Sequence, residues 1–233
     1  MIGCIIQARM GSTRLPGKVM KKIDGEKSII NYLIEQLKFC KSLDDIVVAT
    51  TNLKEDDVIE KHVQNLGLKV YRGRSLNVLD RYYNCAKIHS FNTIVRITSD
   101  NPFIDPYLVD KILTIFSKGS FDYVSNTIRR TFPYGSEVEV FSYSALEKVW
   151  KNAITPYDQE HVTPFLYDKK NSFNIFNYVS SENLSKYRWT LDTKDDLMLI
   201  KEITKRVKKT PVRIDDILNI LKNEPDLIKI NQL

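Results

Sequence analysis

The sequence lacks any long hydrophobic segment. No apolar run approaches the roughly 20 residues that a helix needs to span a bilayer. The first residues, 1–9, have neither the basic stretch nor the apolar length of a signal peptide. We therefore expect a cytoplasmic protein that has no membrane partner.

Cysteine and histidine are also scarce. Three cysteines, Cys4, Cys40 and Cys85, form an odd and widely spaced set, which argues against a disulfide framework and against a cysteine-based zinc site. The three histidines are scattered and supply no cluster of metal ligands. We expect Cys4 and Cys40 to fill core space.

The composition that remains is that of an ordinary globular protein with a basic balance. The 233 residues are 42% hydrophobic and can bury a sizeable core, so we expect a single domain over 1–233. There are 35 Lys and Arg against 29 Asp and Glu, a net charge of +6, which favours an anionic partner such as nucleic acid or a phosphorylated metabolite. No long basic run is present, so we expect no nucleic-acid partner.

Short β-rich runs alternate with amphipathic stretches as far as about residue 125, which predicts an α/β sheet with helices on its faces. Strands are expected at 2–8, 45–51, 69–71 and 93–98. Helices are expected at 28–38, 55–66, 75–88 and 106–117, the third of them with Ser75 as its N-cap. Ligands of such folds bind beyond the carboxyl ends of the strands.

The alternation breaks at about 127–178, which we interpret as a lobe that binds an acceptor or contributes to a subunit contact. A strand is expected at 137–141, then two helices and an extended stretch at 172–178. A further strand at 188–192, a helix at 194–207 and an outer helical tail complete the prediction.

The strongest motif is the segment Gln7-Ala-Arg-Met-Gly-Ser-Thr-Arg-Leu-Pro-Gly-Lys18. It follows the first strand and combines two glycines with three cations and two hydroxyls, which suits a phosphate group. It is not a Walker A loop, because five residues separate Gly11 from Gly17 and Val19 stands where a magnesium-binding hydroxyl belongs. The alternative is an exposed basic turn.

Two aspartates, Asp100 and Asp192, each follow an expected strand. A carboxylate at that edge of the sheet can hold Mg²⁺ together with substrate phosphates. The alternatives are simple turn chemistry for Asp100 and an N-cap role for Asp192 before the helix that starts at residue 194. The linear sequence does not show whether the two carboxylates meet.

Weaker candidates lie in the lobe. Arg129 and Arg130 can recognise a carboxylate or phosphate, although solvated loop arginines are commoner. Glu137 and Glu139 alternate with valines, so one face of that strand is acidic, either for substrate contact or as plain surface. We interpret His161 as structural rather than as a general base.

These motifs resemble the cytidylyltransferase family named for a spore-coat polysaccharide biosynthesis protein, which is similar to CMP-sialic acid and CMP-3-deoxy-manno-octulosonate synthetases. The matching segments are 6–18, 96–100, 135–141, 160–164, 189–193 and 223–231. The resemblance implies a nucleotide-diphospho-sugar transferase (glycosyltransferase-A-like) fold with a mixed, mostly parallel sheet flanked by helices. It also implies transfer of CMP from CTP to an acceptor with Mg²⁺ as cofactor, and a homodimer.

The resemblance assigns roles to individual residues. The nucleotide-binding set is Ala8, Arg9, Met10, Gly11, Ser12, Arg14, Lys18, Arg96 and Asp100, of which Arg14, Lys18 and Asp100 are also expected to be catalytic. The metal carboxylates are expected to be Asp100 and Asp192. The charged residues of the lobe, rather than the resemblance, suggest the acceptor-binding set Arg129, Arg130, Glu137 and Glu139.

The sequence is compatible with more than one acceptor. Tyr134, Ser136-Glu137 and Gln159 depart from the family pattern in the lobe that should contact the acceptor. A nonulosonate-like sugar acid for a surface glycan is one possibility, and a phosphorylated sugar or polyol that gives a CDP-product is another. A glycosyltransferase on the same fold is less favoured, because the chain contains no Asp-X-Asp triplet.

Overall fold

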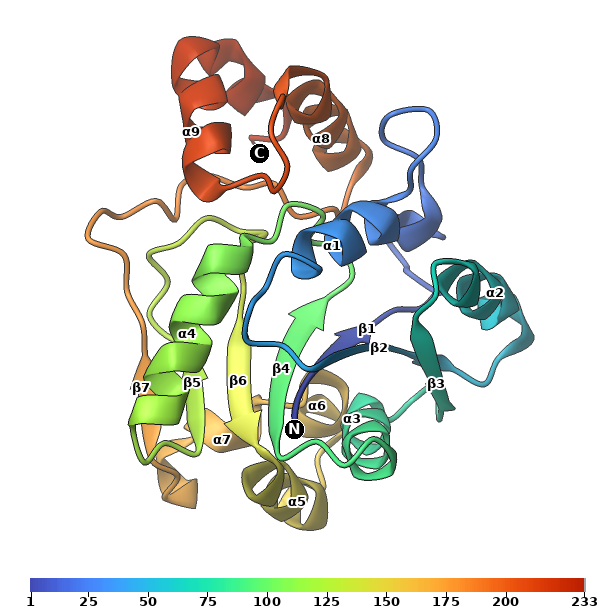
Figure 1. The fold of residues 1–233 in the computed structure, drawn as a ribbon, viewed down its shortest axis with the longest axis vertical. Coiled ribbons are helices and arrows are strands. Elements are labelled where there is room, and N and C mark those ends of the chain that lie inside the picture. The colour runs from blue at the N-terminus through green and yellow to red at the C-terminus, as the bar shows by residue number, and fades with distance from the viewer. Residues whose placement is uncertain (233) are drawn as a thin grey trace.

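The runs expected as strands belong to one seven-stranded sheet in the computed structural model, which describes residues 1–232 (Figure 1). The strands are β1 (Ile2–Gln7), β2 (Asp45–Thr51), β3 (Lys69–Gly73), β4 (Thr93–Thr98), β5 (Tyr123–Ser125), β6 (Glu139–Ser142) and β7 (Ile175–Asn177). Their order across the sheet is β3-β2-β1-β4-β6-β5-β7.

Most neighbouring strands are parallel, which confirms the predicted mixed, mostly parallel sheet. Strand β6 is the exception, because it runs antiparallel to both β4 and β5. From β1 the chain builds outward through β2 and β3, and then returns to place β4 on the other side of β1. The strand order therefore reverses between β1 and β4, and such a switch point is where open α/β sheets bind ligands.

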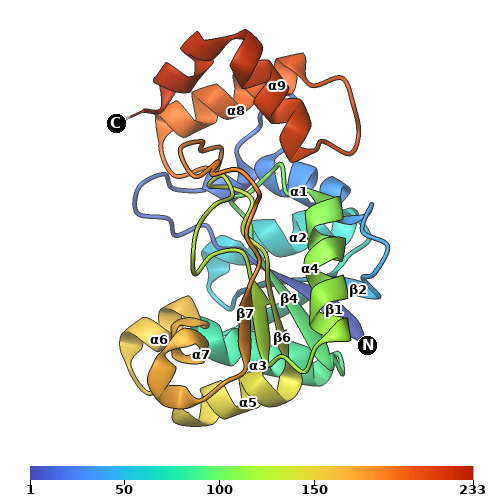
Figure 2. The ribbon, with the colours of Figure 1, turned by 90° about the vertical axis from the view of Figure 1, so that its left-hand side faces the viewer.

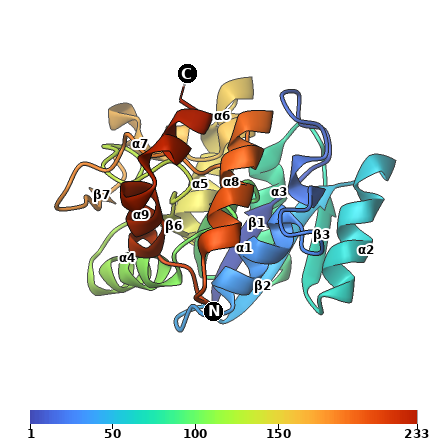
Figure 3. The same ribbon diagram turned by 90° about the horizontal axis from the view of Figure 1, so that it is seen from above.

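Helices cover both faces of the sheet (Figure 1). They are α1 (Ile29–Leu37), α2 (Asp57–Asn65), α3 (Val78–Ile88), α4 (Pro106–Lys118), α5 (Tyr143–Asn152), α6 (Pro156–His161), α7 (Pro164–Tyr167), α8 (Lys194–Arg206) and α9 (Ile214–Asn223). The core on one face contains side chains of α1, α2, α4, α8 and α9, whereas the core on the other contains side chains of α3, α5 and α7. Figure 2 shows α8 and α9 at the end opposite α5, α6 and α7, and Figure 3 shows them from above.

The alternation of side chains along β1 explains why its buried residues 4–6 are all apolar. Cys4 and Ile6 belong to the core on the α1 side, and Ile5 between them belongs to the core on the α3 side. A strand covered on both faces has no solvent side, so it reads as a continuous hydrophobic run. Complete burial of each such side chain stabilises the fold by about 1.5–3 kcal/mol.

Several local predictions are corrected by the structure. Helix α3 begins later than expected, because Asn77 rather than Ser75 accepts the capping hydrogen bond from the Asp80 backbone. The expected strand at 188–192 is reduced to one bridge between Arg188 and Tyr134. Helix α8 is capped by Thr193, which frees Asp192 for other contacts. The short strand β5 was not predicted.

The scarce residues behave largely as expected. Cys4 is fully buried and Cys40 packs against the same core, so both fill core space. Among the helices of residues 1–232, none is long and apolar enough to cross a membrane.

Candidate functional site

The loops that follow β1 and β4 leave the sheet side by side, because Gln7 pairs with Thr98 at the carboxyl ends of these neighbouring strands. A cavity of about 330 Å³ opens at this point. Its lining contains Gln7, Arg9, Ser12, Thr13, Arg14, Lys18, Val19, Val78, Arg96, Thr98, Ser99, Asp100, Glu160, His161 and Asp192. Most of the side chains expected to bind nucleotide, and both expected metal carboxylates, therefore meet in one place.

The loop after β1 folds back on the carbonyl of Met10, which accepts hydrogen bonds from the backbone N–H groups of Ser12 at 2.8 Å and Gly17 at 2.9 Å. Gly17 has a φ of +67°, a left-handed conformation that glycine adopts without strain. Ala8 is buried at the start of the loop, where its N–H bonds Ala49. The loop that is expected to bind phosphate is thus a turn held by its own backbone hydrogen bonds.

Asp56, which was not predicted from the sequence, supports this loop. The buried carboxylate of Asp56 accepts a hydrogen bond from the Met10 N–H at 2.6 Å and another from the Thr51 hydroxyl. Asp56 comes just before α2 and looks like one of several first-turn acids there. Nothing in the sequence distinguishes it from exposed Glu55.

Lys18 brings the two aspartates together. Its Nζ donates to Asp100 Oδ2 at 2.6 Å, to Asp192 Oδ1 at 2.9 Å and to the Leu191 carbonyl at 2.9 Å. Burial by itself lowers the pKa of Lys18, but the charges and hydrogen bonds of Asp100 and Asp192 outweigh burial and raise the pKa above its ordinary value. Lys18 is therefore a cation at neutral pH.

Asp192 contacts two further cations. Arg14 lies 2.9 Å from its Oδ1, and Arg188 donates to its Oδ2 at 2.8 Å. Burial raises the pKa of Asp192, but hydrogen bonds from Lys18 and Arg188 more than offset this and hold the pKa below its usual value. Arg188 was not predicted as a site residue. It also binds Asp196 at 3.0 Å, which fixes it beside the first turn of α8.

Arg96 lies in the floor of the cavity as part of a buried polar network. It donates to Glu139, which also accepts the hydroxyl of Tyr123 at 2.6 Å. Its other terminal nitrogen lies 3.4 Å from the Gln7 side-chain oxygen. Only 4% of Glu139 is exposed, so the interpretation of this residue as plain surface is wrong. Its buried negative charge is tolerated because Arg96 compensates for it.

The other expected acceptor residues lie outside the lining of this cavity. Arg130 forms a 2.6 Å ion pair with Glu137 and stacks over the ring of Tyr134 at 4.0 Å. Glu137 also accepts the N–H of Gly135, so it too is not a solvated surface acid. Arg129 is exposed. Arg130, Glu137 and Tyr134 form a packed corner outside the lining of this cavity, and the side chain of Asn101, next to Asp100, donates to Glu137 at 3.0 Å.

The far side of the cavity is formed by α6. Glu160 lies 3.6 Å from Arg9, and His161 lines the same wall. His161 is solvent-exposed, so it is not a core residue. The His161 side chain is therefore part of the cavity lining.

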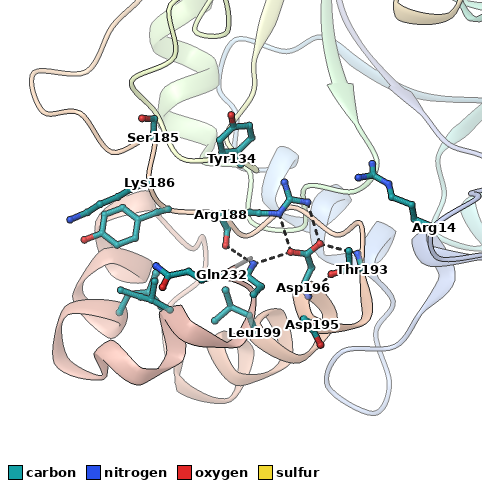
Figure 4. Close-up of a pocket in the computed structure, with 14 residues that line it drawn as sticks. Arg14, Tyr134, Ser185, Lys186, Arg188, Thr193, Asp195, Asp196, Leu199 and Gln232 are labelled. Atoms are coloured by element: carbon teal, nitrogen blue, oxygen red, sulfur yellow. Dashed lines mark hydrogen bonds and ion pairs between the residues drawn. The ribbon is translucent and has the colours of Figure 1, made fainter.

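A second cavity of about 570 Å³ adjoins the first, and Arg14 lines both (Figure 4). Its walls come from Tyr134, the segment 185–188, the N-terminal half of α8, and residues of α9 and of the chain after it. Figure 4 shows Arg188 beside Asp196 at its centre, with Arg14 off to one side. In this cavity the Arg188 guanidinium is paired with two carboxylates, those of Asp192 and Asp196.

The first cavity offers oxygen ligands for a divalent cation. Two carboxylates and one carbonyl converge on the Lys18 ammonium. No cluster of three or more His, Cys, Asp or Glu side chains suited to a metal occurs within residues 1–232. A hard cation such as Mg²⁺ fits this donor set, because it uses one or two carboxylates and takes further ligands from substrate phosphates and water.

A family model described as cytidylyltransferase matches residues 3–224. The chain belongs to the cytidylyltransferase family. It is therefore a CTP-dependent nucleotidyltransferase, and the family expected from its motifs is confirmed.

Relatives of this cytidylyltransferase support the assignment over nearly its whole length. It is 44% identical over 229 residues to an uncharacterized protein of Methanocaldococcus jannaschii, with 97% of this chain and 93% of that protein covered. It is 33% identical over 232 residues to the spore coat polysaccharide biosynthesis protein SpsF of Bacillus subtilis, covering 95% and 94%. An 8-amino-3,8-dideoxy-manno-octulosonate cytidylyltransferase of Shewanella frigidimarina is 32% identical over 125 residues, 51% of this chain and 49% of that one.

Solved structures agree with the fold. A cytidylyltransferase from Leptospira borgpetersenii superimposes with a TM-score of 0.95 at 34% identity, covering 100% of this cytidylyltransferase and 98% of that chain. A CMP:2-keto-3-deoxy-manno-octonic acid synthetase complexed with CTP superimposes with a TM-score of 0.68 at 18% identity, covering 88% and 98%. The nucleotidyltransferase fold implied by the motifs is thereby confirmed.

Proposed function

We propose that this chain transfers CMP from CTP to a hydroxyl of a sugar acid and releases pyrophosphate. The observation that carries the proposal is the cavity at the β1/β4 switch point, where Arg9, Arg14 and Lys18 meet the carboxylates of Asp100 and Asp192. Such a mixture neutralises a triphosphate and provides ligands for the cation that accompanies it.

In this proposal the loop after β1 holds the triphosphate. Arg9, Arg14 and Lys18 neutralise its charge, and Ser12 provides a hydroxyl donor. The acceptor oxygen bonds to the α-phosphorus while the bond from that phosphorus to the bridging oxygen breaks, and the hydroxyl proton passes to solvent. This transfer depends on positioning and on charge stabilisation rather than on a covalent enzyme intermediate.

Asp100 and Asp192 are the residues that would hold a divalent metal, and we propose Mg²⁺. The metal supplies charge neutralisation and a template for the phosphates when it is bound. The chain keeps the two carboxylates in place through the hydrogen bond from the Leu191 N–H to the Asp100 carbonyl and through the ion pair of Asp192 with Arg188.

We propose that the acceptor is an anionic sugar acid and that the CMP-activated product serves the synthesis of a surface polysaccharide. The resemblance to sugar-acid cytidylyltransferases over half of the chain and the relative from spore-coat polysaccharide biosynthesis support this choice. We propose that the lobe at 127–178 faces the acceptor. Within it, the exposed side chain of Arg129 is the candidate for a direct contact, whereas Arg130, Glu137 and Glu139 are held by partners inside the protein.

Pyrophosphate release with Mg²⁺ tests the proposal, with each of the four nucleoside triphosphates measured against sugar acids and against sugar or polyol phosphates. We expect release with CTP and one or more sugar acids. Release only with a phosphorylated acceptor would replace the CMP-product by a CDP-product. No release together with no nucleotide binding would contradict the assigned activity itself.

A further inference from the structure

The space between Asp100 and Asp192 is filled by a side chain of the protein itself. The ammonium of Lys18 has three N–H donors, and the structure provides three acceptors for them between 2.6 and 2.9 Å. These acceptors are the same oxygens that would serve a divalent cation. Only 15% of the Lys18 side chain is exposed, so water competes little for this position.

The charges around the pair are already balanced without a metal. Asp192 faces Arg14 and Arg188 in addition to Lys18. A divalent cation that approaches the nucleotide-free site therefore meets two neutralised carboxylates and three nearby positive charges. Coulomb repulsion from those charges opposes its binding.

We propose that Lys18 acts as an internal counter-ion, which keeps the Asp100–Asp192 pair closed to divalent cations until a nucleoside triphosphate offers its ammonium other anionic partners. Lys18 is thus a positioning residue for the timing of metal binding, in addition to its contact with phosphate. This inference rests on the proposed function, because it assumes that the cavity receives a triphosphate.

The local structure suits such an exchange of partners. Lys18 directly follows Gly17, whose left-handed conformation closes the phosphate loop, and begins a short 3-10 helix at Lys18–Met20. Its backbone N–H bonds the Leu15 carbonyl, so the backbone stays in place. The flexible lysine stem can carry the ammonium from the carboxylates toward the loop without a backbone movement.

Titration of the nucleotide-free protein with Mn²⁺, followed by the electron paramagnetic resonance signal of free Mn²⁺, tests the inference. We expect Lys18→Met to raise the affinity for Mn²⁺ at least tenfold over the wild type. Lys18→Arg, which keeps the charge, is expected to stay within threefold of the wild type. Adding Asp100→Asn to Lys18→Met is expected to abolish the gain.

Arg14→Met is the matched control, because within residues 1–232 Arg14 forms an ion pair with Asp192 and with no other carboxylate, and 66% of its side chain is exposed. A gain in Arg14→Met as large as that in Lys18→Met would overturn the inference, since it would reflect net charge only. An unchanged affinity in Lys18→Met would overturn it as well. Circular dichroism checks the fold of each variant, and Lys18→Gln replaces Lys18→Met if the latter does not fold.

The result is independent of the assay for the proposed function. The Mn²⁺ titration contains neither CTP nor acceptor. If the wild type releases no pyrophosphate but Lys18→Met binds Mn²⁺ tightly, the proposed activity is rejected and the counter-ion role of Lys18 is supported. If the wild type releases pyrophosphate normally but Lys18→Met does not bind Mn²⁺ more tightly, the activity is supported and the counter-ion role is rejected.

Discussion

Asp100 and Asp192 hold the same ammonium but differ in what else supports them. Asp192 faces two arginines besides Lys18, whereas Lys18 is the cation found beside the Asp100 carboxylate within residues 1–232. Loss of Asp100 leaves Lys18 with two of its three acceptors. The fold should therefore survive substitution of Asp100, while the arrangement proposed for the metal should not.

We expect Asp100→Ala to lower kcat/KM for pyrophosphate release by about 10²-fold or more, the scale of losing one group that stabilises charge in the transition state. His161→Ala is the comparison, because His161 lines the same cavity but is not one of the three groups that accept hydrogen bonds from Lys18. We expect it to cost less than about tenfold.

Two results would contradict these roles. Near-full activity of Asp100→Ala at low Mg²⁺ would remove Asp100 from the proposed metal site. A loss in His161→Ala as large as that in Asp100→Ala would assign a general base to α6.

At the level of secondary structure, the first turn of α8 connects stability to the site. Thr193 caps the helix, and the Asp196 carboxylate accepts the N–H groups of Asp192 and Thr193, each at 2.9 Å. The same carboxylate binds Arg188, which in turn binds Asp192. The helix start and the site therefore depend on one another.

The acid stability of the protein should depend on Asp196. Burial raises its pKa, but hydrogen bonds from Arg188, Asn231 and the Asp192 backbone outweigh burial and lower the pKa to about 2. The unfolded value is about 3.9. A depressed folded pKa contributes stability above pH 4, and this contribution, about 1–2 kcal/mol, is lost as the pH falls from about 4 to about 2.

Urea unfolding at pH 6 and pH 3 measures this contribution. We expect Asp196→Asn to reduce the free energy of unfolding at pH 6 and to differ less from the wild type at pH 3. Asp226→Asn is the control, because the Asp226 side chain is 88% exposed. An equal difference between Asp196→Asn and the wild type at both pH values would show that the Asp196 charge is not what stabilises the helix start.

At the level of the whole molecule, α6 and the turn before it present apolar side chains to solvent. Ile154 is 82% exposed and Tyr157 is 61% exposed, at the end of the molecule formed by α5, α6 and α7 (Figure 2). Exposed apolar side chains that gather in one region are typical of a protein contact. We propose that this part of the lobe at 127–178 is the contact between two copies of the chain.

Light scattering of the protein in solution tests the proposed homodimer. We expect twice the chain mass of 27.1 kDa, and we expect Ile154→Asp to shift the mass toward that of one chain. Val58→Asp on α2 is the control, because Val58 is an exposed apolar residue outside the lobe. A mass of one chain at every protein concentration would contradict the proposed subunit contact in the lobe.

The amino-acid sequence was sufficient to predict the mostly parallel sheet and the family, and it also predicts a phosphate-binding role for the loop at 7–18. Continuous apolar runs such as 45–51 can be buried on both faces only in a covered sheet, so they predict the parallel strands β1 to β4 with small errors at the ends. The loop motif at 7–18 could be interpreted because its glycines and cations are contiguous and serve one local turn. Local patterns of this kind need no distant partner.

Which charged side chains contact one another became known from the three-dimensional structure. Asp56 beneath Met10, Arg188 beside Asp192 and Glu139 beneath Arg96 are contacts across 46, 4 and 43 positions. A buried charge is tolerated where a partner of opposite charge or several hydrogen-bond donors compensate for it. That compensation is a property of positions in space, so the sequence did not single out Asp56 or Arg188 as site residues and left Glu139 open as a surface acid.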